Sequence, residues 1–259
     1  MDQSIIFILA PIFFAISFVY SSVGFSGGSS YTAILVLSGI SLSTVPSISL
    51  LLNIVVSVVT FFNYVRARYL SLRLSLPFLS SIPFAFISGM LLIPQKSLLI
   101  IFIIALFAAS AALFTSASKI KRQRLEKLYY SNVRIMMVGI PVGAFLGFIA
   151  GLVGIGGGIW LSPFLILSGL ADPKQAAATA SLFILTNSIS GFIGHSISKP
   201  LDFSLLIPLA VVVLIGGLLG SRYGAFKFNH DKIRMIVAAI VAVAGIELTM
   251  KLINSLTHL

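Results

Sequence analysis

The sequence contains no cysteine and few charged residues. Without cysteine the chain forms no disulfide, builds no thiolate metal site and uses no thiol chemistry to move a substrate. Only 9% of its residues are charged, against about 25% in a typical soluble domain, and 58% are hydrophobic. Apolar stretches of about 20 residues, enough to cross a bilayer as a helix, recur along the whole length. These figures exclude a soluble globular domain and predict an all-α polytopic membrane protein.

Acidic residues are scarce, with 6 Asp and Glu against 17 Lys and Arg, which gives a net charge of +11. The basic residues cluster in three short loops between apolar stretches, as the positive-inside rule predicts for cytoplasmic loops. They are not interleaved with aromatic residues and match no nucleic-acid-binding module. We therefore expect a lipid bilayer around the chain and no nucleic-acid partner.

Residues that would form a catalytic centre are also missing from the sequence. It contains no Ser/His/Asp set within reach, no histidine or carboxylate cluster with metal-ligand spacing, and no phosphate-binding loop with its lysine. We expect no enzyme activity, no cofactor and no metal.

Glycine is abundant, and two glycine-rich stretches repeat each other about half a chain length apart. Val23-Gly24-Phe25-Ser26-Gly27-Gly28 matches Val153-Gly154-Ile155-Gly156-Gly157-Gly158, and 8 of the 17 positions from 23 to 39 are identical to their counterparts. Pro77 and Pro208 keep nearly the same spacing, so the register persists into each half. A repeat at half the chain length predicts two copies of one unit. The expected division is 1–117 for the first transmembrane repeat, 118–134 for a basic cytoplasmic linker and 135–259 for the second repeat.

Each repeat is expected to contain one glycine-broken helix pair and three spanning helices, giving about 8 full spans or 10 helical segments. The expected segments are 4–20, 31–40, 46–65, 76–93 and 97–116, then 135–152, 159–169, 174–195, 204–221 and 235–253. The N-terminus has no basic region and no small-residue cleavage site, so the first apolar run is expected to be kept as a helix.

The basic residues also predict the topology. If each broken pair forms a hairpin or two short tilted spans, each half makes an odd number of crossings and the two repeats are inverted. A cytoplasmic linker then places 14 of the 17 Lys and Arg inside and only Lys96, Lys199 and Lys251 outside. This predicts a multi-pass protein of the cytoplasmic membrane with both termini outside.

The paired glycine loops are the predicted binding site, since glycine breaks at matching places in two apolar halves are typical of transporters. Such a loop exposes backbone N–H groups at the start of the next helix, where the helix dipole favours an anion. The alternative is that glycine only permits close helix packing. We apply that alternative to two series in which glycine recurs every fourth residue, Gly143, Gly147 and Gly151, and Gly216, Gly220 and Gly224.

Small polar residues around the loops are further candidates, because hydroxyls and amides donate to anion oxygens without the cost of a buried charge. In membranes such groups also commonly bond a carbonyl of their own helix, which is the alternative role for each of them. The predicted substrate-binding residues are Gly24, Phe25, Ser26, Gly27, Gly28, Ser29, Ser49, Asn53, Gly154, Ile155, Gly156, Gly157, Gly158, Thr179, Ser181 and Asn187.

Two ionisable residues in apolar segments have competing interpretations. Glu247 is a possible proton-coupling site, since intramembrane carboxylates are commonly functional. Lys251 lies one turn further on, however, and an interfacial Glu–Lys pair is the simpler account. His195 is expected at the outer surface, at the end of the segment 174–195, where a role as a pH sensor is the alternative to a position at the interface without one.

The glycine repeat, the Leu-x-Leu-Ser-Gly sequences that follow it and the Ala-Thr-Ala-Ser run at 178–181 resemble the TauE/SafE family of sulfite exporter-type permeases. The second half, 151–195, is the more similar, because Ser26 replaces a glycine in the first. The resemblance implies transport, mostly export, of sulfite, sulfoacetate, other sulfonates or small carboxylates. Thiosulfate uptake of the kind that depends on cysteine residues is not expected, because this chain contains no cysteine.

Together these patterns predict a secondary transporter of small anions that works by alternating access at the two glycine loops. The alternatives are an uncoupled anion channel or facilitator and a membrane scaffold that transports nothing. The exposed small residues are compatible with a homodimer.

Overall fold

The computed structural model describes residues 3–40, 44–91, 132–198 and 203–229, together with residues 232, 236 and 239. All the regular structure in these ranges is helical. Five described stretches are long and apolar enough to cross a membrane, namely Val45–Arg66, Leu72–Met90, Ile135–Val153, Pro173–Ile197 and Leu206–Lys227. The predicted all-α, multi-pass class is confirmed. The segments 97–116 and 235–253 and the linker 118–131 lie outside the described residues, apart from two single positions.

The described helices follow the predicted segments closely. They are α1 (Gln3–Ser21), α2 (Gly28–Leu37), α3 (Val45–Arg66), α4 (Leu72–Ser75), the 3₁₀-helix η1 (Leu76–Ser80), α5 (Ser81–Met90), α7 (Asn132–Val153), α8 (Gly158–Leu167), α9 (Pro173–Ser198), α10 (Phe203–Arg222) and the π-helix η2 (Tyr223–Lys227). The main difference concerns the predicted segment 76–93. It begins earlier, at Leu72, and is 3₁₀-helical around Pro77, which has no N–H for an α-helical bond.

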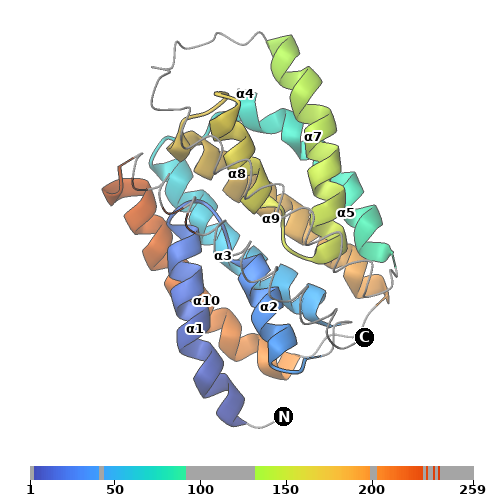
Figure 1. The fold of residues 1–259 in the computed structure, drawn as a ribbon, viewed down its shortest axis with the longest axis vertical. Helices are drawn as coiled ribbons and strands as arrows, with labels where there is room; N and C mark the ends of the chain where they lie inside the picture. Colours follow the sequence, from blue (N-terminus) through green and yellow to red (C-terminus); the bar gives the residue numbers. More distant parts are fainter. Residues whose placement is uncertain are drawn as a thin grey trace.

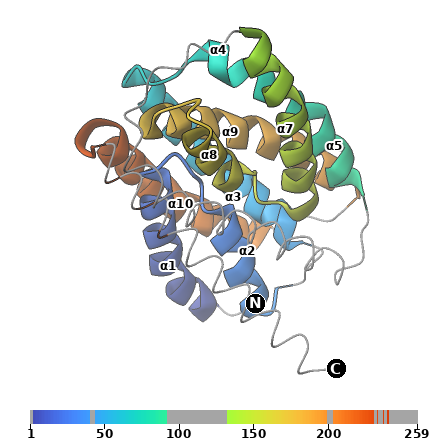
Figure 2. The same cartoon turned by 45° about the horizontal axis from the view of Figure 1, so that its top comes forward.

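The central pair of the fold is α3 and α9, which pack against each other (Figure 1). In two views α1 and α10 lie together on one side of this pair, and α5 and α7 lie on the other (Figure 1, Figure 2). Helices α1, α3 and α5 come from the first half of the sequence, whereas α7, α9 and α10 come from the second. The principal contacts therefore join the two halves to each other.

Small residues bring the outer helices close together. Gly139, Gly143, Gly147 and Gly151 of α7 face η1 and α5, where an added Cβ would collide with backbone or side-chain atoms. Gly216, Gly220 and Gly224 face the backbone of α1 and the residue that follows it. The predicted packing role of the two four-residue glycine series is confirmed. The sequence repeat matches α1 with α7, and it matches the α5 segment with α10. The contact between α1 and α10 therefore corresponds to the contact between α7 and α5.

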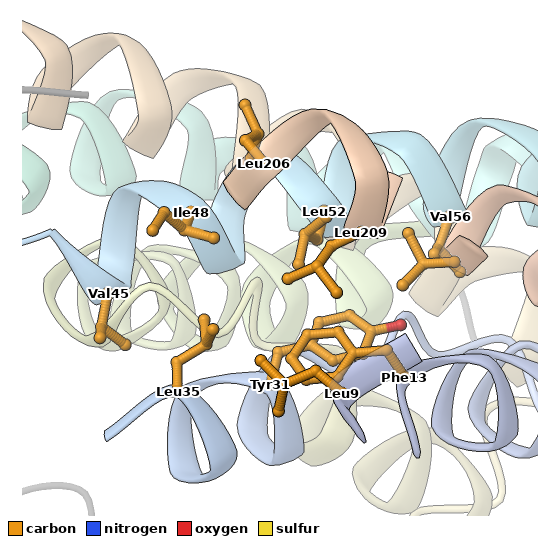
Figure 3. Packing of buried hydrophobic residues seen from close by; sticks show 11 residues of the cluster. Leu9, Phe13, Tyr31, Leu35, Val45, Ile48, Leu52, Val56, Leu206 and Leu209 are labelled. Atoms are coloured by element: carbon orange, nitrogen blue, oxygen red, sulfur yellow. The ribbon is translucent and has the colours of Figure 1, made fainter. Parts of the chain in front are cut away.

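Two hydrophobic cores follow the same reciprocal arrangement. One joins α1, α2, α3 and α10, where Phe13 and Tyr31 stack with ring centroids 4.8 Å apart (Figure 3). The other joins α4, η1, α7, α8 and α9. Several core positions match each other at the spacing of the sequence repeat. These pairs are Tyr31 with Leu161, Leu35 with Leu165, Val45 with Ala176, Leu52 with Phe183 and Phe78 with Leu209.

The matched central helices run antiparallel. Tyr64, near the end of α3, shares a buried cluster with Ala177 and Ala178, near the start of α9. Leu50, near the start of α3, lies beside Gly191 towards the end of α9. In a bilayer, antiparallel matched helices are what inverted repeats require. The opposite membrane orientation of the two halves and the domain boundaries remain predictions.

Candidate functional site

The two glycine loops break the helical path with left-handed backbone. Gly24 and Gly27 have φ of 87° and 96°, and Gly154, Gly156 and Gly157 have φ of 76–78°. Residues with a Cβ rarely adopt this region, so these five positions require glycine for the turn itself. The loops connect long helices to the short helices α2 and α8.

Each loop packs against the first turns of the central helix from the other half. An added Cβ at Gly154 would lie 2.7 Å from the Cα of Pro46, at the start of α3. An added Cβ at Gly24 would lie 2.5 Å from the Cα of Ala177, near the start of α9. Neither loop could accept a side chain here without moving a neighbouring backbone.

The short helices begin midway along the central helices. Gly28, the first residue of α2, lies against the Asn53 side chain, and Leu35 near its other end packs with Val45 at the start of α3 (Figure 3). In the second half, Gly158 lies against Ile184 of α9. Each short helix thus covers half of a long one, and the N-termini of α2 and α8 both lie at the middle of the fold.

The two loops meet at Asn53. A Cβ on Gly28 would collide with the Asn53 amide and would lie 2.8 Å from the carbonyl oxygen of Ile155 in the second loop. A Cβ on Gly156 would lie 3.3 Å from Asn53 Nδ2 and 2.9 Å from Ser188 Oγ. One asparagine of α3 therefore contacts both loops, and Ser188 of α9 adjoins the same place.

Several buried polar side chains in the loops and the central helices have no hydrogen-bond partner among the described residues. They include Ser26 Oγ, both amide atoms of Asn53, both amide atoms of Asn187 and Ser188 Oγ. Each of these four residues is at most 2% exposed. A buried amide or hydroxyl is normally paired, so the unpaired Asn53 amide and Ser188 hydroxyl, which both face Gly156 of the second loop, indicate a site for a polar ligand.

The starts of α2 and α8 add backbone donors. In α2 the first hydrogen bond to a loop carbonyl is donated by the Tyr31 N–H to the Gly27 carbonyl oxygen. In α8 it is donated by the Trp160 N–H to the Gly157 carbonyl oxygen. The N–H groups before them, from Gly28 and Gly158 onward, are the first of their helices and have no acceptor inside them. The N-terminus of α2, with roughly half a positive charge, therefore adjoins the Asn53 amide, and α8 begins two residues after Gly156, which faces the same amide.

Several predicted site residues have other partners. Ser49 Oγ donates to the Gly28 carbonyl at 3.0 Å, which anchors the start of α2. Thr179 Oγ1 pairs with Ser75 Oγ at 3.0 Å, and Ser181 Oγ donates to the Ala178 carbonyl of its own helix at 2.8 Å. The aromatic ring of Phe25 packs against Tyr20. These four side chains have structural contacts of their own.

The remaining loop positions fill the space between helices. Gly27 lies against Ile16 and Tyr31, Gly157 against Phe183 and Ala150, and Gly158 against Ile184. Ser29, in the first turn of α2, is buried. Glu247 lies outside the described residues.

Sequence reasoning missed Ser188, although a signal was present. Ser188 matches Ser57 at the same repeat spacing that relates Pro77 to Pro208, and it directly follows Asn187. The hydroxyl of Ser57 bonds the Ile54 carbonyl of its own helix at 3.2 Å. The two matched serines therefore differ in what they contact.

The prediction that His195 lies at the outer surface is wrong. The residue is fully buried, and its Nε2 is 2.8 Å from the carbonyl oxygen of Gly151 in α7. Gly151 has no side chain, so its backbone comes close enough to be reached. Helix α9 continues to Ser198, so His195 is not its last residue. The imidazole of His195 instead connects α9 to α7.

A cavity of about 730 Å³ lies away from the glycine loops, at the ends of α3 and α10. It is lined by Asn63, Arg66, Leu218, Leu219, Arg222, Tyr223, Phe226 and Lys227. Asn63 is ten residues from Asn53 along one helix, about 15 Å at 1.5 Å per residue. The cavity is therefore distinct from the meeting point of the loops.

A family model described as "Sulfite exporter TauE/SafE" matches residues 9–248. A "Probable membrane transporter protein y4hK" of Sinorhizobium fredii is 28% identical over 246 residues, 93% of this chain and 96% of the relative. A "Probable membrane transporter protein YunE" of Bacillus subtilis is 33% identical over 111 residues, 43% of this chain and 40% of that protein. A "Probable membrane transporter protein MJ0441" of Methanocaldococcus jannaschii is 23% identical over 208 residues, 76% of each chain. No solved structure matches the chain.

Proposed function

Because the chain belongs to the sulfite exporter TauE/SafE family and is a multi-pass membrane transporter, we propose that it carries small sulfur-containing anions such as sulfite, sulfoacetate or other sulfonates. The observation that supports this most strongly is the meeting of the two glycine loops at the unpartnered amide of Asn53.

The donors at this meeting point suit an oxyanion. The N-termini of α2 and α8 present backbone N–H groups, and Asn53 and Ser188 add side-chain donors. The side chains that face the loop glycines are all neutral, so no fixed cation would hold the ligand permanently. Helix N-termini attract negative charge, and sulfite and sulfonates carry three oxygens that can accept bonds from several directions at once. A neutral site of this kind binds an anion and can still release it.

The arrangement of the helices supports alternating access as the mechanism. The matched helices α3 and α9 run antiparallel, and each loop packs on the start of the central helix from the other half. If one half rocks against the other, the starts of α2 and α8 separate and come together around the anion. In this proposal the repeats are inverted, the basic ends face the cytoplasm, both termini are outside and transport proceeds as export. A homodimer is compatible with this scheme.

Glu247 is the candidate for coupling to protons, and an interfacial pair with Lys251 is the alternative. An intramembrane carboxylate that binds and releases a proton during the cycle would make flux depend on pH. Glu247→Gln should then abolish the pH dependence of flux while leaving the protein folded. An unchanged pH profile in that variant would leave Glu247 with the interfacial pairing to Lys251.

The proposal is tested by flux into proteoliposomes containing the purified protein, driven by gradients of sulfite, sulfoacetate, taurine and acetate. We expect saturable movement of one anion and competition by its analogues. Flux that rises linearly with concentration would favour the uncoupled channel. Folded protein that moves none of the four would refute the anion site and favour a scaffold.

A further inference from the structure

Lys174 is a buried cation that the anion site described above does not use. It lies in the first turn of α9 and is 6% exposed. Its Nζ donates to Tyr69 Oη at 3.1 Å and to the Ala225 carbonyl oxygen at 3.2 Å, and it lies 4.8 Å from the centroid of the Tyr69 ring. These contacts of the ammonium group are with two neutral residues, and the Asp172 carboxylate in the same turn accepts the backbone N–H of Lys174 at 2.9 Å. Burial of an ammonium group is costly unless a negative charge compensates it, and neutral oxygens offset only part of that cost.

The contacts of Lys174 join three separate elements. Tyr69 belongs to the turn that follows α3, Ala225 belongs to η2, and Lys174 itself begins α9. Two of these elements have unusual backbone. Arg68, beside Tyr69, has φ of 63°, and η2 is a π-helix, a form that is often found at functional sites. We call Lys174, Tyr69 and Ala225 the lysine clasp.

The clasp lies next to the first glycine loop. Ala177, one turn after Lys174, packs against Gly24, and Tyr64 Oη donates to the Ser22 carbonyl oxygen at 2.7 Å. Tyr64, Ala177 and Ala225 belong to one buried cluster. The clasp therefore lies beside the first glycine loop, on the side where α9 begins.

We propose that Lys174 is a second binding residue for the transported anion, on the side of the first glycine loop where the basic residues are concentrated. This rests on the function proposed above. An anion that reaches Lys174 forms a charge-assisted bond, which is stronger than the bonds to the neutral oxygens of Tyr69 and Ala225. The anion displaces those oxygens, and the three elements that the clasp joins can then separate. When the anion leaves, the ammonium returns to Tyr69 and Ala225 and the route closes.

The test uses the absence of native cysteine, which makes an introduced thiol unique. Lys174→Cys is purified, reconstituted and treated either with 2-aminoethyl methanethiosulfonate, which adds an ammonium at the end of a chain, or with methyl methanethiosulfonate, which adds no charge. Modification is checked by intact mass. The matched control is Lys227→Cys, because Lys227 lies on the neighbouring η2 and is exposed.

We expect Lys174→Cys to move a subsaturating concentration of the anion about tenfold more slowly than the wild type, which corresponds to one charge-assisted bond. The aminoethyl group should restore most of that flux and the methyl group none of it. Lys227→Cys should transport like the wild type in all three states. Equal recovery with both reagents, or wild-type flux from unmodified Lys174→Cys, would overturn the proposal.

Two further outcomes separate this proposal from the one on which it rests. Wild-type protein that moves none of the tested anions refutes the proposed function, whereas wild-type flux that is unchanged in Lys174→Cys refutes only the role of Lys174. If the cysteine variant does not fold, Lys174→Gln keeps two N–H donors for the clasp and removes the charge. A glutamine variant that folds and transports normally, or that also fails to fold, shows that Lys174 serves only the structure.

Discussion

Replacing Asn53 with leucine should stabilise the protein and weaken anion binding at the same time. Both amide atoms of Asn53 lack a partner among the described residues, and the side chain is fully buried. A buried amide without a hydrogen bond costs about 1–3 kcal/mol, and leucine of similar size removes that cost. For a chain of this length we expect a rise in melting temperature of about 2–4 °C per kcal/mol.

The loss of binding follows from the same amide. A hydrogen bond to a charged group contributes about 1.5–3 kcal/mol, which corresponds to an increase in Kd of about 10- to 150-fold. Thermal unfolding in detergent measures the first effect, and calorimetric titration of the transported anion measures the second. A residue that served only the structure would not show this opposite pair of changes.

Asn63 provides the matched control on the same helix. Its Nδ2 donates to Ser221 Oγ at 2.8 Å, so its amide already has a protein partner. Asn63→Leu should lower the melting temperature and leave Kd unchanged. If Asn53→Leu lowers the melting temperature like Asn63→Leu, or binds the anion as tightly as the wild type, the assignment of Asn53 to the site is wrong.

Three other substitutions test the surrounding structure. Gly28→Ala places a methyl group against the Asn53 amide and should raise Kd at least about tenfold while the protein stays folded, as measured by titration; unchanged affinity would contradict the close approach. Gly147→Val forces α7 away from the backbone of α5 and should destabilise the protein by about 1–3 kcal/mol, visible as earlier thermal unfolding; an unaltered melting curve would argue against that packing. Tyr64→Phe removes a buried bond to the first glycine loop and should cost about 1–3 kcal/mol in denaturant titration, whereas no loss would exclude that bond as a stabilising contact.

The glycine loops can be predicted from the sequence because the need for a residue that tolerates positive φ is local to each position. Gly24 and Gly154 adopt positive φ at matching positions, and a repeat of identical residues reflects the same backbone need in both halves. The packing glycines of α7 and α10 were also predictable, since a four-residue period of small residues leaves one face of a helix open to close approach.

The polar residues of the site were harder to predict because their role depends on how α9 is rotated. Thr179 and Ser188 are similar hydroxyl residues on one helix, yet Thr179 bonds Ser75 whereas Ser188 faces Gly156 of the second loop. The sequence repeat does not identify the polar residues of the site either. The residue of α9 that matches Asn53 of α3 is the apolar Ile184, which faces Gly158 as Asn53 faces Gly28. His195 was misplaced for a related reason, since its acceptor is a backbone carbonyl that no sequence pattern marks.

The most direct test of the anion site is whether the transported anion protects a thiol placed in the first glycine loop. Ser26 is buried and its hydroxyl lacks a partner among the described residues, so Ser26→Cys introduces a single, nearly isosteric thiol into that loop. We predict that the anion slows modification of this thiol by a small methanethiosulfonate reagent in a saturable manner, with a midpoint equal to the Kd for binding. Modification at the same rate with and without saturating anion, from folded and transporting protein, would show that the anion does not bind where the two loops meet.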